Sequence, residues 1–486
     1  MTLIRSIAAS RRRKTLLILS QTFIPDPASV GQHMADVAFE MARRGYRVRV
    51  YTSARGYEDA RVKYPPREYI DGVEIRRLPF GSFGKKSLLL RVLGTALFQF
   101  QSLLVGLTIP RVDGVFFSTS PPLIGVVATL IGFFRNVPIA YWAMDLNPDQ
   151  LIALGKIKPT SLAAHFLEGA NRLILRRASL VVALDRFMAE RLAGPGRSLL
   201  KVRRSGSLSR YAGGGLGWGL PRRFRKRPPP HPSPGVPGEG VRGPKAIALL
   251  AGRVDLRHKM LVMPPWPHES HIDADSHVGA ETNPFRIRHG LDGKFVVMYS
   301  GNHSAANPLT TLLDAAVALK DDPRVRFLMV GGGAGKQEVE AAIRDHDLAN
   351  LKSLPYQPLS ELKYSLSAAD LHVVTLGPEM VGIVHPCKIY GAMTVGRPIL
   401  YFGPRPSHIT DLLNSHRFGV CIDHGDVPGA VAAIQKFAQA SSDDLNQMGS
   451  EALKVLRESF SQNILQSRFC DHVEDALFPV AAVDVS

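Results

Sequence analysis

The strongest constraint on the fold of this chain is an alternation of short apolar runs with amphipathic segments. Between the first two apolar runs, Met34, Val37, Ala38 and Met41 recur at the spacing of one helix face, and Gly45 follows as a helix stop. Fully apolar runs of this length are typical of parallel strands that are buried on both faces. The first α/β unit is therefore predicted to have strands at Leu16–Leu19, Val48–Tyr51, Gly114–Phe117, Pro138–Trp142 and Leu180–Leu184.

The same alternation returns in the second half of the chain. A chain of 486 residues is too long for one ordinary core and suits two such units. Open parallel sheets bind ligands beyond the carboxyl ends of their strands, so we predict an α/β fold of two tandem Rossmann-like domains with the active site in the interdomain cleft. The second unit is predicted to have strands at Phe295–Tyr299, Phe327–Val330, Leu371–Val374, Pro398–Phe402 and Val420–Ile422, and helices at Pro308–Leu319, Gln337–Ile343 and Ala430–Ala438.

The predicted domain boundaries leave one segment that fits neither unit. We expect an N-terminal domain over residues 1–265, a C-terminal domain over 266–455, and a helical segment over 456–486 that packs back towards the first domain. Residues 197–245 are rich in Gly, Pro and Arg and carry +11 of the net charge of +18, which predicts a disordered basic insert. The insert is either an arm for nucleic acid or anionic lipid, or an insertion tolerated as a surface loop. We favour the second and expect no specific nucleic-acid partner.

Composition and cysteine content narrow the class of protein further. With 45% hydrophobic and 21% charged residues, the composition is that of a globular protein rather than a disordered or polytopic membrane chain. Cys387, Cys421 and Cys470 fit neither a disulfide framework nor a zinc site. No uninterrupted apolar run is long enough to require a transmembrane helix, and Gln21 breaks the apolar run after the basic N-terminus, which argues against an export signal. We expect a cytoplasmic protein.

In the first domain, two acidic residues follow the fourth predicted strand, where its carboxyl end opens into the cleft. A carboxylate at Asp145 can orient or deprotonate an acceptor hydroxyl, or it can be a helix cap. For Asp149 we favour the capping role. The turn from Phe23 to Gly31 lacks the signatures of nicotinamide-binding and P-loop turns, and it is either a plain connection or a close approach for an acceptor or phosphate.

In the second domain, two strand-to-helix turns carry small residues. Gly301, Asn302 and His303 follow the first strand of this domain, where backbone amides at a helix start suit a diphosphate. His303 is expected either to add a charge or a donor there or to be a packing residue. Gly332 lies in a second glycine-rich turn, which is a weak signal when taken alone.

The segment from Gly382 to Met393 predicts a loop followed by a short helix that Pro386 opens. The amide dipoles of that helix start, together with the Lys388 cation, would neutralise a leaving diphosphate. The alternative is a lysine on a solvated helix face. We therefore take Lys388 and Asp145 as candidate catalytic residues, and Pro386 and Lys388 as part of the predicted diphosphate site.

Several segments in this order resemble glycosyltransferase family 4, the retaining GT-B enzymes, and especially the branch that acts in bacterial capsule, O-antigen and colanic-acid assembly. They are FIPDPASVGQHM at residues 23–34, Trp142–Gly155, Met263–Trp266, Tyr299–His303 and the block from Pro386 to Pro398. The resemblance covers nearly the whole chain outside the insert. It implies a GT-B fold in which the N-terminal domain binds the acceptor and the C-terminal domain binds a nucleotide sugar. The chain departs from the family pattern at Gly391.

Many family members carry a paired-glutamate motif whose second glutamate holds the ribose of the donor. Gly391 stands at that position in this chain, so the ribose contact must come from elsewhere. Glu379 lies nearby in the sequence, but its register does not match the first glutamate of the motif, and no family role is carried onto it.

The resemblance implies a retaining transferase that moves a sugar from a nucleotide sugar, UDP-linked by that resemblance, to a lipid-linked or polysaccharide acceptor. It also implies that no metal or other cofactor is needed, because helix amides, Lys388 and His303 would stabilise the departing diphosphate. Two alternatives remain: a nucleotide-sugar epimerase of the same architecture, and a non-catalytic scaffold that binds nucleic acid or membrane through the basic insert.

A segment of the first domain, Lys85–Ile109, combines cations with apolar residues at helical spacing. Such a segment can lie in the interface of an anionic membrane without spanning it. We expect it to bring the protein to the inner face of the cytoplasmic membrane, and the alternative is an ordinary core helix.

Overall fold

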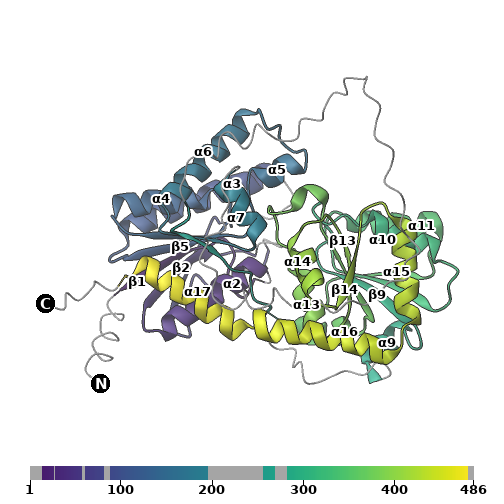
Figure 1. The fold of residues 1–486 in the computed structure, drawn as a ribbon. Helices are drawn as coiled ribbons and strands as arrows, with labels where there is room; N and C mark the ends of the chain where they lie inside the picture. The colour runs from purple at the N-terminus through teal and green to yellow at the C-terminus, as the bar shows by residue number, and fades with distance from the viewer. Residues whose placement is uncertain are drawn as a thin grey trace, which may run out of the picture.

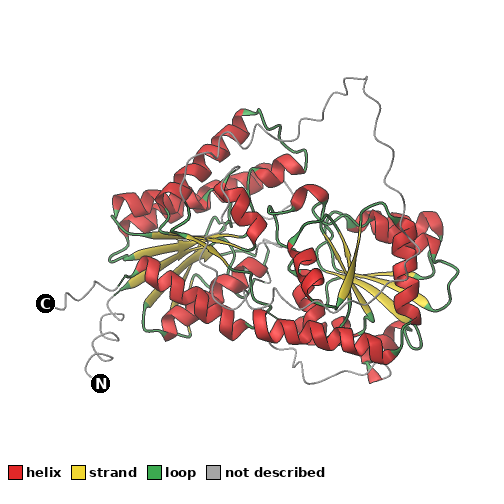
Figure 2. Ribbon diagram, in the orientation of Figure 1, coloured by secondary structure: helices red, strands yellow, loops and turns green. Residues whose placement is uncertain are grey.

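The computed structural model describes residues 14–26, 28–56, 61–81, 88–194, 256–268 and 282–479. Within them the chain forms two α/β domains, each built on its own sheet with helices on both faces (Figure 1, Figure 2). The two predicted α/β units are therefore confirmed. The basic insert predicted at residues 197–245 lies outside the described residues, and its disorder stays a prediction.

The first sheet has eight strands in the order β3-β4-β2-β1-β5-β6-β7-β8. All neighbouring pairs are parallel except β3 with β4, which form an antiparallel hairpin at one edge. Strand β1 is central and fully buried, so the apolar run after the basic N-terminus is a core strand. The strands are β1 (Thr15–Leu19), β2 (Arg47–Ser53), β3 (Arg67–Ile70), β4 (Val73–Leu78), β5 (Gly114–Phe117), β6 (Ile139–Ala143), β7 (Leu180–Ala183) and β8 (Met260–Val262).

The helices of the first domain cover both faces of this sheet. Helices α3, α4 and α6 lie side by side on one face, and α2 lies on the other (Figure 1). Four of the seven residues that α2 buries are Met34, Val37, Ala38 and Met41, the apolar stripe that the sequence shows. The helices are α2 (Ser29–Arg43), α3 (Leu88–Thr108), α4 (Ile124–Phe134), α5 (Asp149–Ala153), α6 (Leu162–Arg177) and α7 (Arg186–Ala193).

The second sheet has six parallel strands in the order β11-β10-β9-β12-β13-β14. Its strands are β9 (Phe295–Ser300), β10 (Val325–Val330), β11 (Leu351–Leu354), β12 (Leu371–Thr375), β13 (Ile399–Phe402) and β14 (Gly419–Ile422). Its helices are α9 (Pro284–His289), α10 (Thr310–Ala318), α11 (Lys336–His346), α12 (Leu362–Ser367), α13 (Lys388–Thr394), α14 (His408–Ser415), α15 (Val427–Gln439) and α16 (Ser442–Val455).

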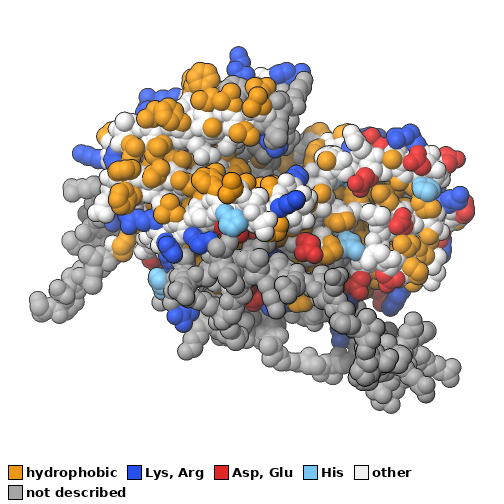
Figure 3. All heavy atoms as spheres, turned by 90° about the horizontal axis from the view of Figure 1, so that it is seen from above, with side chains coloured by type: hydrophobic (Ala, Val, Ile, Leu, Met, Phe, Trp, Pro, Cys, Tyr) orange, Lys and Arg blue, Asp and Glu red, His pale blue; other side chains and the backbone are white. Residues whose placement is uncertain are grey.

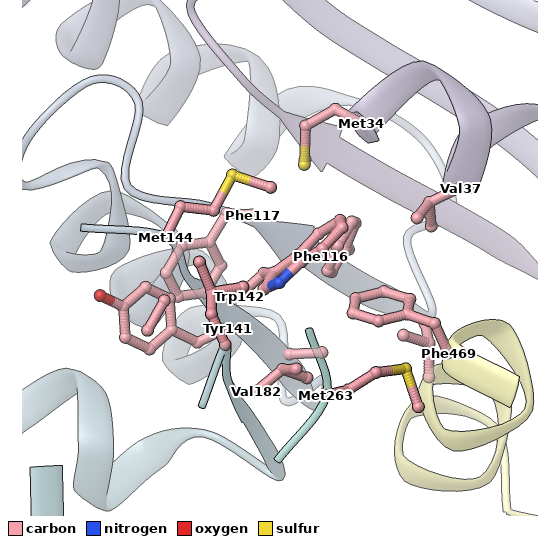
Figure 4. Close-up of a cluster of buried hydrophobic side chains, with 14 of the residues drawn as sticks. Met34, Val37, Phe116, Phe117, Tyr141, Trp142, Met144, Val182, Met263 and Phe469 are labelled. Atoms are coloured by element: carbon pink, nitrogen blue, oxygen red, sulfur yellow. The ribbon is translucent and has the colours of Figure 1, made fainter. Parts of the chain in front are cut away.

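The last helix, α17 (Gln462–Leu477), returns from the second domain to the first. Its Phe469 side chain enters the first-domain core, where the ring centroids of Phe469 and Trp142 are 4.2 Å apart (Figure 4). Gln466 donates a hydrogen bond of 2.7 Å to the carbonyl of Asp36 on α2. Arg44, at the end of α2, forms ion pairs with Asp471 and Glu474 of α17. This helix is therefore part of the first-domain core.

Helix α3 bears on the expectation that no transmembrane helix is required. Within the described residues, Leu89–Thr108 has the length and the apolar composition of a helix that could cross a membrane, although polar residues interrupt its apolar run. In the structure α3 packs along α4, and Gly106 allows this approach because a Cβ atom there would lie 2.2 Å from Ile131. Only 22% of this apolar stretch is buried, so most of the helix surface is open.

Candidate functional site

A loop of the second domain, residues 381–387, lies directly against the first domain. Leu146, just after β6, donates a backbone hydrogen bond of 3.0 Å to Ile383, and Asp145 and Val384 form an isolated antiparallel bridge. Arg191 of α7 donates to the carbonyl of Val381 at 3.2 Å. The turn that carries Asp145 is therefore next to the loop that leads to Lys388, although the two lie in different domains.

The Lys388 side chain lies over Gly301, the residue that follows β9. A Cβ atom at Gly301 would come within 2.6 Å of Lys388 Cε, and Gly301 has a φ of +132°, so only glycine fits there without strain. Lys388 Nζ is 5.4 Å from the centroid of the Tyr299 ring. The structure thus brings together Gly301 and Lys388, two residues that the sequence placed on separate motifs.

The glycine-rich turn after β10 packs against the turn after β9. A Cβ atom at Gly331, whose φ is +133°, would lie 2.1 Å from the carbonyl oxygen of Gly301. His303 donates a backbone hydrogen bond of 2.7 Å to Gly332, and Gly335 donates one of 3.0 Å to His303. Because these contacts are between backbones, the glycines let two loops meet at the carboxyl ends of β9 and β10, where we expect a diphosphate.

His303 is fully buried in this loop pair. Burial lowers its pKa, so the ring is neutral near pH 7, and the geometry favours a neutral group over the charge considered from the sequence. Nδ1 lies 3.3 Å from the carbonyl of Gly332, an acceptor, which places the proton of the neutral ring on Nδ1. Nε2 has no partner among the described residues and is left as an acceptor, which suits a hydroxyl better than a phosphate oxygen. Asn302 is exposed beside it.

Lys388 is half-buried and has no ion pair or hydrogen bond with the part of the chain that the structure describes. Burial lowers the pKa of its ammonium group to about 8, because a charge is less well solvated there. An anion placed against Nζ would remove this penalty and raise the pKa again. The site therefore favours a ligand with negative charge.

The start of α13 differs slightly from the expectation. The helix begins at Lys388 with Cys387 at the N-cap, so Pro386 lies just before the helix instead of opening it. The amide of Ile389 still bonds to the carbonyl of Pro386 at 3.3 Å, which tightens this first turn. Gly391 is buried within α13.

Asp145 is half-buried at the carboxyl end of β6. Burial raises the pKa of its carboxyl group to about 6, and the carboxylate has no hydrogen bond or ion pair with the described residues. The capping alternative is wrong, because α5 begins at Asp149 with Pro148 at its N-cap. Asp149 is not the cap either: it is the first residue of α5 and forms an ion pair of 3.2 Å with Arg191.

A buried polar cluster that the sequence did not predict lies beside these residues. Asp185, just after β7, accepts a hydrogen bond of 2.9 Å from Nδ1 of His385, and Nε2 of His385 is 2.9 Å from the hydroxyl of Tyr390. His385 stands in the segment that the sequence singled out, but no spacing linked it to Asp185. Separately, no cluster of His, Cys, Asp and Glu in the described ranges has the form of a metal site.

Comparison with known proteins matches both halves of the chain to one class of protein. A family model described as a glycosyl transferase 4-like domain matches residues 29–203, and one described as glycosyl transferases group 1 matches residues 282–455. The two models therefore correspond to the two α/β domains.

Two curated relatives share part of the sequence. The chain is 24% identical over 230 residues to the probable glycosyltransferase WbjE of Pseudomonas aeruginosa, which covers 47% of this chain and 56% of WbjE. It is 27% identical over 175 residues to the putative colanic acid biosynthesis glycosyl transferase WcaI of Escherichia coli K12, which covers 35% of this chain and 42% of WcaI. The chain thus matches about half the length of these curated relatives.

Among solved structures, the fold is similar to that of HepE from Anabaena in complex with UDP and glucose. The TM-score is 0.60 at 15% sequence identity, with 94% of this chain and 99% of HepE covered. At this identity the likeness shows the fold, and it agrees with the GT-B architecture that the sequence predicted.

Proposed function

Because the chain belongs to the family 4, group 1 glycosyltransferases of GT-B fold, we propose that it transfers a sugar from a nucleotide sugar to an acceptor hydroxyl. We propose further that the reaction retains the anomeric configuration and needs no metal or other cofactor. The acceptor is lipid-linked or a polysaccharide, and the product enters a cell-surface glycan. WcaI, whose name places it in colanic acid biosynthesis, supports this direction.

One observation carries the proposal. A lysine without an anionic partner among the described residues faces a pair of glycine-rich turns, and the loop before this lysine contacts the turn that carries a carboxylate of the other domain. Lys388 lies on Gly301, and the Asp145 turn is bridged to the loop that precedes Lys388. A cation beside close-packed backbone loops suits a diphosphate leaving group. A carboxylate from the other domain suits an acceptor hydroxyl.

UDP is the nucleotide that we propose for the donor. HepE, which shares the fold, was solved with UDP and with UDP-glucose. Gly391 cannot supply a carboxylate for the ribose, and the unpartnered Nε2 acceptor of His303 is a group in the same loop pair that can take a sugar or ribose hydroxyl. We therefore assign His303 to a hydroxyl of the donor and Lys388 to its diphosphate.

The activity is tested by a screen of nucleotide sugars against the purified chain. We expect UDP-linked sugars to raise the thermal midpoint of unfolding, because a ligand that binds only the folded state stabilises it. Release of UDP in the presence of lipid-linked acceptor, with retention of configuration in the product, completes the test. An exchange of configuration on the donor sugar, with no transfer to an acceptor, would instead favour the epimerase.

The pH dependence of transfer follows from two pKa shifts. The pKa of Asp145 is raised to about 6, so its carboxylate becomes protonated, and its contribution to transfer is lost, as the pH falls through that value. The pKa of Lys388 is lowered to about 8, so its ammonium group loses its charge, and its contribution to transfer, as the pH rises through that value. We expect kcat/KM to rise through about pH 6 and fall through about pH 8, and Lys388→Arg to move the alkaline limb upwards. A flat profile over this range contradicts both assignments.

We propose that the acceptor is met at the inner face of the cytoplasmic membrane, where the first domain docks without spanning the bilayer. Helices α3, α4 and α6 lie side by side, and Figure 3 shows hydrophobic side chains gathered over this part of the molecule. The exposed large hydrophobic side chains on these helices are Leu89, Leu90, Val92, Leu93, Phe100, Leu104, Phe133, Phe134, Leu162, Phe166 and Leu173.

The charges on these three helices support an anionic membrane as the partner. Arg91 lies on α3, and Arg172, Arg176 and Arg177 lie on α6, while Glu168 is their single acidic residue. Cations beside an apolar face favour the interface of an anionic leaflet, each by about 1 kcal/mol at most. A membrane surface would also cover apolar area that the described parts of the chain leave open.

Flotation with anionic vesicles at low salt tests this docking face. We expect the wild-type chain to float, and Phe100→Glu with Phe133→Glu to reduce the floating fraction severalfold, because both side chains are exposed and would enter the apolar layer. Ile287→Glu is the matched control, since Ile287 is 58% exposed on α9 of the second domain. If the wild-type chain stays at the bottom of the gradient, the membrane proposal is wrong.

A further inference from the structure

The Asp185–His385 contact is a buried link between the two domains. The side chain of His385 is 0% exposed and that of Asp185 is 4% exposed. Beyond His385, the hydroxyl of Tyr390 on α13 lies 3.3 Å from Nε2 of His408, the first residue of α14. A carboxylate of the first domain is thus joined through one imidazole ring to the helix that begins with Lys388.

Both carboxylate oxygens of Asp185 are in use. Oδ1 accepts from the backbone amide of Met188 at 2.8 Å and caps α7, while Oδ2 accepts from His385. Burial alone would raise the pKa of Asp185, but its hydrogen bonds with His385 and with the amide of Met188 help to outweigh burial, and the pKa is lowered. An ionised Asp185 fixes the proton on Nδ1 of His385, and with it the ring orientation that points Nε2 at Tyr390.

Backbone hydrogen bonds connect His385 to the start of α13, where Lys388 lies. The amide of Cys387 donates to the carbonyl of His385 at 2.9 Å, and the amide of Tyr390 donates to Cys387 at 3.0 Å. On the other side of His385, Gly382 lies close enough to the first domain that a Cβ atom there would be 2.6 Å from the carbonyl oxygen of Phe187. The loop before α13 is therefore held at both ends, and His385 is its buried side-chain anchor.

We propose that Asp185, acting through His385, is a positioning residue for the nucleotide-sugar site. It holds the start of α13, and so Lys388, in the position that binds the donor diphosphate. The donor site on the second domain is then complete only when the first domain supplies this carboxylate. The inference rests on the proposed function, because it assigns the donor diphosphate to Lys388.

A neighbouring link provides the control. Arg186, the next residue, donates two hydrogen bonds of 2.7 and 3.0 Å to Asp411 of α14. This pair also joins the domains, but its side chains are 48% and 39% exposed and it does not touch α13. A general role in holding the domains together would make the two links equivalent, whereas a positioning role makes them different.

The test measures UDP affinity by calorimetry and donor KM and kcat with UDP-glucose as the probe sugar, for Asp185→Asn, Tyr390→Phe, the double variant and Arg186→Ala. We expect Asp185→Asn and Tyr390→Phe each to raise the UDP Kd and the donor KM about tenfold, with a smaller change in kcat. We expect the double variant to lose no more than either single one, because both act through one ring. Arg186→Ala should change these values about twofold at most.

Folding and tautomer are checked on the same proteins. Asn is a good N-cap, so Asp185→Asn should keep its thermal midpoint close to that of the wild type. The ¹⁵N shifts of the His385 ring should show the proton on Nδ1 in the wild type and on Nε2 in Asp185→Asn. Additive losses, or an effect of Arg186→Ala as large as that of Asp185→Asn, overturn the positioning role alone. A wild-type chain that neither binds UDP nor transfers sugar overturns the proposed function and this inference with it.

Discussion

Lys388→Ala is expected to slow sugar transfer about tenfold to a thousandfold, or about 1.5–4 kcal/mol, with a matching loss of UDP affinity. The half-buried ammonium group has no anionic partner in the part of the chain that the structure describes, so its charge is available to the diphosphate. The loss should be largest in kcat/KM, because the diphosphate gains charge as the sugar leaves. Steady-state kinetics and calorimetry with UDP measure both quantities.

The control for this variant is Lys352→Ala in the same domain. Lys352 lies on the edge strand β11, where its ammonium group donates to the carbonyl of His289 at 3.3 Å. We expect this variant to retain wild-type kinetics. If Lys388→Ala keeps both its rate and its UDP affinity, the diphosphate assignment is wrong and the lysine only covers Gly301.

Asp145→Asn is expected to lower kcat about a hundredfold while changing UDP affinity about twofold at most. The substitution keeps the size of the side chain but removes a carboxylate that has no partner among the described residues. Because Asp145 belongs to the first domain and Lys388 to the second, the loss should fall on the acceptor side of the reaction. Acceptor KM, kcat and UDP affinity measured on one preparation separate these effects.

Asp149→Asn is the matched control on the same turn. It removes one partner of a part-exposed ion pair with Arg191, which should cost little stability and leave transfer nearly unchanged. A parallel fall in thermal midpoint and activity for Asp145→Asn would mean that this carboxylate supports the turn instead of the reaction.

Most of the fold could be predicted because its strands are apolar and buried on both faces. Two of the missed regions are at sheet edges. The β3–β4 hairpin places Arg67, Glu68, Glu74 and Arg76 on a half-exposed surface, so no apolar run marks it. Strand β11 buries Leu351 alone, and Lys352 faces solvent. An edge strand needs only one covered face, and the four residues of β3 and of β11 are too few to show that alternation.

The candidate site was predicted where a residue directly follows a buried strand, as Asp145 and Gly301 do. Contacts between the domains could not be predicted in this way. Asp185 and His385 are 200 residues apart in the sequence, and each taken alone is an ordinary polar residue near a helix start. The pair is buried only because the two domains pack together. The spacing of residues within either segment therefore could not predict this contact.

The path of α17 has a consequence for how the protein is made. Phe469 and the residues around it complete the core of the first domain, yet a ribosome adds them only after the whole second domain. Until they emerge, Trp142 and the face of α2 lack a covering, and the growing chain holds an unfinished first domain while the second one forms. The chain returns from the second domain to the first just before α17, so any movement of one domain relative to the other must bend the chain there.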